Sequence, residues 1–165
     1  MLSKTIQKAF DTQIKDELES AYLYLSMSSY CNAESFLGFG KWLRMQAQEE
    51  LGHGMKLFDY VHHRGGHASL QAIEQPKAHF SSLLELFKMV LDHEKKVTAR
   101  IHKLYQMTTT ENDYAGQIEL QWFVTEQVEE EQNATMIVEQ LKMIGDNKAA
   151  LLMMDKEIGT RSNVL

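Results

Sequence analysis

The segment Val124-Thr125-Glu126-Gln127-Val128-Glu129-Glu130-Glu131 lies in the middle of the last long helical run and decides the fold. Around it, side chains suited to burial recur at steps of three and four residues, which is the spacing of one helix face. The residues on this face are Leu120, Phe123, Gln127, Glu130, Ala134, Ile137, Leu141 and Ile144. Two polar residues interrupt the middle of the stripe, so we expect Gln127 and Glu130 to meet a partner inside the protein.

Three earlier runs carry the same kind of stripe, and each also has a glutamate near its middle. In the run over residues 4–33, the stripe contains Ile6, Phe10, Ile14, Glu17, Ala21, Tyr24, Ser28 and Cys31. In the run over residues 36–64, it contains Phe39, Leu43, Ala47, Glu50, either His53 or Gly54, Leu57 and Val61. In the run over residues 82–108, it contains Leu83, Phe87, Val90, Glu94, Val97, Ile101 and Leu104. The sequence therefore predicts four long amphipathic helices, each with a carboxylate at mid-length on its buried face.

Length and composition indicate one domain over residues 1–165 rather than several. The chain has 165 residues and a net charge of −6, which argues against a nucleic-acid or anionic-membrane partner. Its first residues lack the apolar segment of a secretory signal, and no apolar run approaches the length that spans a bilayer. The single Cys31 cannot form an internal disulfide. We expect a soluble, cytoplasmic protein.

Residues 65–81 form the connection that sets the topology. They show no periodicity, contain the only proline, Pro76, and follow the pair Gly65-Gly66, which is typical of a helix end. A helix of about 28 residues is about 42 Å long, and about 12 extended residues are needed to return along it. We therefore predict an all-α four-helix bundle with one long crossover. The expected helices cover residues 4–33, 36–64, 82–108, 112–143 and a short fifth at 147–159; Ser35 is the expected N-cap of the second.

The mid-helix carboxylates pose an electrostatic problem that metal ions solve. Side-by-side helices bring Glu17, Glu50, Glu94 and Glu130 to one level, where burial and mutual repulsion oppose their ionisation. Two divalent cations carry the four compensating charges. Carboxylate oxygens with one imidazole, from His53, suit iron or manganese and leave positions open for oxygen or water. Tyr24 and Gln127 lie at the same level. The other histidines (His62, His63, His67, His79, His93 and His102) are expected in loops or on the surface.

The motifs Glu50-x-x-His53 and Gln127-x-x-Glu130 resemble those of the ferritins, in particular the bacterial non-haem ferritins, and the resemblance runs essentially end to end. Bacterioferritins keep a histidine at the position of Glu130. The resemblance implies that Glu17, Glu50 and His53 bind a first iron, with Glu50 bridging, and that Glu94 and Glu130 bind a second beside Gln127. It places Tyr24 and Trp122 next to this centre. It also implies a third iron site formed by Glu49, Glu126, Glu129 and Glu130.

The same resemblance implies a function and an assembly. Ferritins of this kind are ferroxidases: ferrous iron and dioxygen are the substrates, and the ferric product is stored as an oxyhydroxide mineral inside a hollow shell. The shell is a homo-oligomer of twenty-four subunits, with the fifth helix at its four-fold axes and two to three irons at each centre. No haem is expected, because the haem-binding methionine of bacterioferritins corresponds to Leu51.

Two other functional classes stay open from the residues alone. One is a carboxylate-bridged di-iron redox enzyme that acts on an organic substrate or peroxide; a rubrerythrin is disfavoured, because one cysteine cannot build its four-cysteine iron domain. The other is a metal-free helical scaffold, which the buried carboxylates oppose. Stoichiometric retained iron would favour the enzyme, and many irons per subunit would favour storage.

Overall fold

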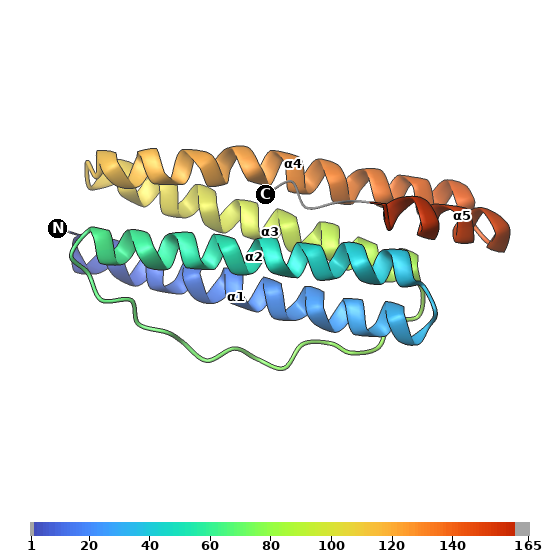
Figure 1. Cartoon of the computed structure of the whole chain (residues 1–165). Helices are drawn as coiled ribbons and strands as arrows, with labels where there is room; N and C mark the ends of the chain where they lie inside the picture. The colour runs from blue at the N-terminus through green and yellow to red at the C-terminus, as the bar shows by residue number, and fades with distance from the viewer. Residues whose placement is uncertain (1, 161–165) are drawn as a thin grey trace.

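The computed structural model describes residues 2–160, which form five α-helices and no β-strand. The helices are α1 (Lys4–Ala33), α2 (Leu37–His63), α3 (Leu83–Thr110), α4 (Tyr114–Ile144) and α5 (Lys148–Ile158). The four long helices lie side by side, and α5 packs at the end of the bundle where α4 finishes (Figure 1). The predicted all-α bundle with one crossover is confirmed. None of these helices combines the length and the apolar character that crossing a bilayer requires.

Side-chain caps fix where four of the five helices begin. Ser3, Ser82, Asp113 and Asn147 each accept a hydrogen bond from the backbone N–H three residues later. The prediction that Ser35 caps α2 is wrong. Phe36 is the N-cap and makes no side-chain cap bond, while Ser35 adopts a left-handed conformation with φ of 66°. Its N–H bonds to the carbonyl of Asn32, so Ser35 belongs to the turn that ends α1.

The crossover after α2 runs back along the bundle, so that α2 and α3 point in the same direction (Figure 1). It is fastened to both halves of α1. Gln7 Nε2 donates to the carbonyl of His67 at 3.0 Å, and Ser26 Oγ donates to the carbonyl of Lys77 at 2.9 Å. These bonds satisfy part of the loop's backbone and give the long connection a defined course.

A polar layer divides the core into two apolar halves. One half contains Phe39, Phe87 and their neighbours, and the other contains Phe10, Leu57 and theirs. The layer between them is made of buried polar side chains from all four long helices: Gln13, Glu17, Gln46, Glu50, His53, Glu94, Gln127 and Glu130. Buried polar groups are costly unless they are paired, so this layer is where a ligand would stabilise the bundle most.

Candidate metal centre

The four glutamates on the helix stripes all reach the polar layer. Glu17 of α1, Glu50 of α2 and Glu94 of α3 are each 1% exposed, and Glu130 of α4 is 5% exposed. Each long helix thus contributes one carboxylate, as the seam spacing predicted. Four buried carboxylates at one level require either protons or cations.

Three side chains form the closest group of metal-binding atoms among the described residues. One donor atom from each of Glu17, Glu50 and His53 lies within 4.8 Å of the others. His53 Nδ1 is 3.8 Å from Glu17 Oε2 and 3.6 Å from Glu50 Oε2. Glu50 Oε2 is buried and accepts no hydrogen bond, which costs free energy in a core. Two carboxylates and one imidazole around an unsatisfied oxygen fit a divalent cation of the iron type.

The carboxylates of α3 and α4 are held by hydrogen bonds on the opposite side of the layer. Tyr24 Oη donates to Glu94 Oε1, and Gln127 Nε2 donates to Glu94 Oε2 at 3.2 Å. Gln46 Nε2 donates to Glu130 Oε2 at 2.6 Å. Among the described residues, these side chains do not form a second group of three metal-binding residues. A cation that binds here would have to replace some of these hydrogen bonds to the carboxylate oxygens.

Burial is the main cause of the raised pKa values of the four glutamates in this layer. Removal from water raises the pKa of Glu50 to about 8, with the charge of Glu130 adding to the effect. It also raises the pKa of Glu130 to about 8, reinforced by Glu94, and the pKa of Glu94 to about 7. The pKa of Glu17 is raised well above its ordinary value by burial and then by Glu50. The metal-free layer consequently holds protons at neutral pH, which a cation would displace.

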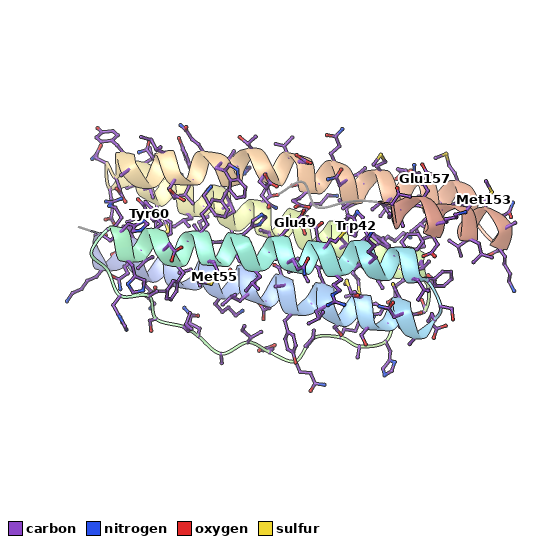
Figure 2. The ribbon with its side chains drawn as sticks, viewed as in Figure 1. Trp42, Glu49, Met55, Tyr60, Met153 and Glu157 are labelled. Carbon is purple, nitrogen blue, oxygen red and sulfur yellow. The ribbon has the colours of Figure 1, made fainter. Side chains whose placement is uncertain are left out.

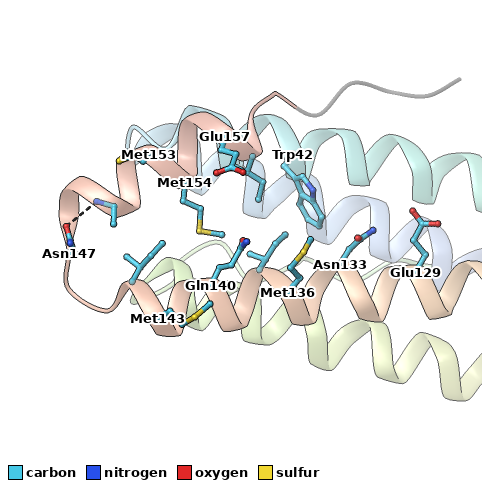
Figure 3. A pocket seen from close by; sticks show the side chains of 14 residues that line it. Trp42, Glu129, Asn133, Met136, Gln140, Met143, Asn147, Met153, Met154 and Glu157 are labelled. Atoms are coloured by element: carbon cyan, nitrogen blue, oxygen red, sulfur yellow. Dashed lines mark hydrogen bonds between the residues drawn. The ribbon is translucent and has the colours of Figure 1, made fainter.

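Three of the four glutamates expected to form a further iron site lie on the flank of this layer. Glu49 and Glu126 are half-buried and Glu129 is exposed. Figure 2 shows Glu49 at mid-length on α2. Glu129 lines a cavity of about 810 Å³ between α4 and α5 (Figure 3). Burial raises the pKa of Glu126, while the neighbouring His53 lowers it. These acids therefore lead from the buried layer towards the surface.

Aromatic groups border the centre on the same flank. The Trp122 ring meets His53 edge to face, with centroids 5.1 Å apart, and Lys56 Nζ lies 3.8 Å from the Trp122 ring centroid. This edge-to-face contact between imidazole and indole limits the orientations available to His53. Leu51, at the position of the bacterioferritin haem ligand, is 49% exposed and has no ligand atom.

The structure also adds residues that the sequence reasoning missed. The expectation that His93 is a surface or loop residue is wrong: it is half-buried, its Nε2 is 2.7 Å from Ser20 Oγ, and its ring meets Tyr24 edge to face. Burial lowers the pKa of His93 to about 4. Gln13 and Gln46 were missed too, although each lies four residues before a seam glutamate, a spacing that shares a helix face.

Comparison with known proteins agrees with this geometry. Residues 7–144 match the ferritin-like domain family. The chain is 41% identical over 162 residues to a bacterial non-heme ferritin of Staphylococcus aureus, with 98% of each chain covered. A crystal structure of an open pore ferritin from the archaeon Archaeoglobus fulgidus superposes with a TM-score of 0.97 at 48% identity, covering 98% of this chain and 99% of that one. A humanized archaeal ferritin superposes with a TM-score of 0.98 at 47% identity, covering all of both chains.

The family match spans most of the chain, and both the sequence and the structural relatives cover nearly all of it. A bundle with one crossover, one buried carboxylate from each long helix and a histidine three residues after the second of them is the arrangement of this family. The chain belongs to the ferritin family.

Proposed function

We propose that this ferritin stores iron, which it first oxidises with dioxygen at the buried centre. The observation that carries the proposal is the close group of Glu17, Glu50 and His53, with the unpartnered oxygen of Glu50 directed into it. A buried carboxyl oxygen without a hydrogen-bond partner in a dry core is explained by a cation that binds there. Membership in the ferritin family supports ferrous iron as that cation.

Each residue of the centre then has a role. Glu17 and His53 hold the first ferrous ion, Glu50 bridges the two ions, and Glu94 and Glu130 hold the second. Each ion gives one electron to dioxygen, which is thereby reduced by two electrons, and the ferric ions then leave for storage. Gln127 is a neutral ligand, so it holds the second ion more weakly than a carboxylate would and favours release. Tyr24 hydrogen bonds to Glu94 and keeps that carboxylate oriented.

The proposed assembly is a shell of twenty-four copies without haem. Apolar side chains that a monomer leaves uncovered support association with further copies. Tyr22 and Leu25 of α1 are 50% and 49% exposed, and Leu70 of the crossover is 64% exposed. Such side chains on neighbouring segments are typical of surfaces that other subunits cover.

Aerobic iron loading with measurement of the particle mass tests storage against the alternatives. We expect a particle many times the mass of the 19.0 kDa chain, which takes up far more iron than its centres can bind. A particle that retains only stoichiometric iron after prolonged loading would instead indicate a di-iron redox enzyme. A particle that binds no iron would indicate a helical scaffold.

A double variant, Glu49→Gln with Glu126→Gln, tests the third iron site. We propose that these flank acids hold an iron that supplies an extra electron to oxygen and slows renewal of the centre. The fast oxidation phase should survive, because neither residue belongs to the buried group. The ratio of iron oxidised to oxygen consumed should fall towards about two. Rapid-mixing oxidation with parallel oxygen measurement checks both quantities.

Two results would contradict this assignment. Loss of the fast phase would place Glu49 and Glu126 in the primary centre. An unchanged iron-to-oxygen ratio and renewal rate would make them ordinary solvated acids. Glu139→Gln, on the same helix as Glu126 but exposed and paired with Lys142, is the matched control and should leave the ratio unchanged.

A further inference from the structure

Two buried glutamines in the polar layer have no role in the function proposed above. Gln13 of α1 is 3% exposed and Gln46 of α2 is 1% exposed. A primary amide carries two N–H donors and an acceptor, so its burial is costly unless partners are provided. Each amide donates a hydrogen bond to a carboxylate of the centre, so each has a specific contact there in addition to its place in the helix.

Gln13 fixes one oxygen of Glu17. Its Nε2 donates to Glu17 Oε1 at 2.7 Å, within the buried part of α1. The other oxygen, Glu17 Oε2, lies 3.8 Å from Nδ1 of His53, and both residues belong to the metal-binding group. The amide therefore holds the carboxylate in the rotation that presents Oε2 to the place where the first ion would bind.

Gln46 acts on a different helix from its own. Its Nε2 donates to Glu130 Oε2 at 2.6 Å, so a side chain of α2 orients the carboxylate of α4. Glu50 lies one turn further along α2, so the same helix face carries a ligand of the centre and the residue that orients another. The hydrogen bond engages only one of the two oxygens of Glu130.

A neutral donor suits this task better than a cation. Lysine or arginine at either position would place a fixed positive charge beside the carboxylate, compete with a ferrous ion and lock the pair together. Serine or threonine would be too short to reach across from α2 to α4. An amide gives a hydrogen bond without charge, so the carboxylate keeps its full negative charge for the metal.

We propose that Gln13 and Gln46 are positioning residues of the iron centre, each dedicated to one ion. Gln13 turns a Glu17 oxygen towards the first ion, and Gln46 turns a Glu130 oxygen towards the second. The inference rests on the proposed function, because it needs both carboxylates to be iron ligands. It explains why each of the two amides lies buried beside a carboxylate rather than in the apolar halves of the core.

The variants Gln13→Met and Gln46→Met test the proposal. Methionine is unbranched and close in size but has no N–H donor. Crystals of the assembled protein are equilibrated with graded Zn²⁺, a redox-silent stand-in for ferrous iron, and occupancy at each position is measured by anomalous scattering. We expect Gln46→Met to raise the half-saturating concentration at the Glu94–Glu130 position by about tenfold, and that at the Glu17–Glu50–His53 position by less than about twofold. Gln13→Met should do the reverse, so each variant is the control for the other.

Impaired folding would not produce this crossed pattern. If either methionine variant fails to assemble, Gln13→Asn and Gln46→Asn replace them; they are smaller, remain polar and fall one methylene short, and should shift the same position in the same direction. Equal weakening of both positions, or no weakening, would overturn the positioning roles. If the parent protein itself binds no Zn²⁺ at these carboxylates, the proposed centre fails instead.

Discussion

Glu17→Gln should abolish rapid iron oxidation while making the metal-free protein more stable. Glu17 is 1% exposed, and its carboxylate faces Glu50 and His53. The substitution removes one buried acid that the metal-free layer must keep protonated, and a glutamine carbonyl can still accept the Gln13 hydrogen bond. The same change takes away a charged ligand of the first ion, so stability and activity should move in opposite directions.

Both effects are large enough to measure directly. Oxidation in rapid-mixing experiments should slow by about a hundredfold or more, beyond what the loss of a supporting residue outside the ligand set costs. Relief of one buried carboxyl should stabilise the metal-free protein by about 1 kcal/mol, which is about 2–4 °C in the unfolding midpoint for a chain of this length. Added Zn²⁺ should stabilise the parent protein far more than the variant, because binding to the folded state is linked to stability.

Glu19→Gln is the matched control on the same helix. Glu19 bonds to Lys15 at 2.5 Å and lies outside the polar layer, so its neutralisation should leave the oxidation rate unchanged. If Glu17→Gln oxidised iron at the parental rate, Glu17 would not be a ligand, and the proposed centre would be wrong. If it lost both activity and stability, the acid would have a structural partner that the buried layer does not reveal.

The elements that were predictable from the sequence are those whose apolar residues recur with the helical period. The stripe through Leu83, Phe87, Val90 and Val97 contains a single polar residue, Glu94, and the structure buries all of them. Helix ends lie within one or two residues of the expected ones, since glycine, serine and aspartate mark them chemically. Periodicity assigns a residue to a face, and that was sufficient to bring the four glutamates together.

Contacts between helices were not predictable in this way. A helical face does not specify which neighbour a side chain meets, so nothing in the spacing of Gln46 and Glu130 joins them, although Gln46 orients that carboxylate. His93 lies next to Glu94 in the chain and about 100° away around the helix, so its place in the periodicity does not reveal a buried contact. The neighbouring α1 covers it through Ser20 and Tyr24. The prediction that Ser35 caps α2 was wrong for a local reason. Its backbone closes the turn after α1, so it cannot also begin α2.

Cation binding to the metal-free centre should release protons at neutral pH. Burial raises the pKa of Glu50 and of Glu130 to about 8, so at pH 7 the folded protein keeps most of both protons. The pKa of Glu94, raised to about 7, leaves that carboxyl about half protonated. Because a bound cation requires ionised carboxylates, Zn²⁺ should displace about two or more protons per subunit at pH 7. Calorimetric titration in buffers of different ionisation heat counts them.

The same protons make the stability of the metal-free protein depend on pH in an unusual direction. In the unfolded chain these carboxyls ionise near pH 4.5, so between pH 7 and 8 the folded state binds more protons than the unfolded state. The free energy of unfolding therefore falls as the pH rises through this window, by roughly 1 kcal/mol for each of Glu50 and Glu130. His93, with its pKa lowered to about 4, is neutral in the folded state across this window and nearly so in the unfolded state, so it adds little.

The variant Glu50→Gln shows how much of the proton release and of the pH dependence of stability comes from these buried carboxyls rather than from other titrating groups. The variant should release about one proton fewer on binding Zn²⁺ at pH 7 and lose about half of the fall in stability between pH 7 and 8. Zn²⁺-saturated parent protein should lose nearly all of that fall, because its carboxylates are already ionised. Denaturant unfolding of the metal-free protein at the two pH values provides the comparison. Binding without proton release at pH 7 would mean that the four glutamates are ionised in the empty centre, and that burial does not govern their charge.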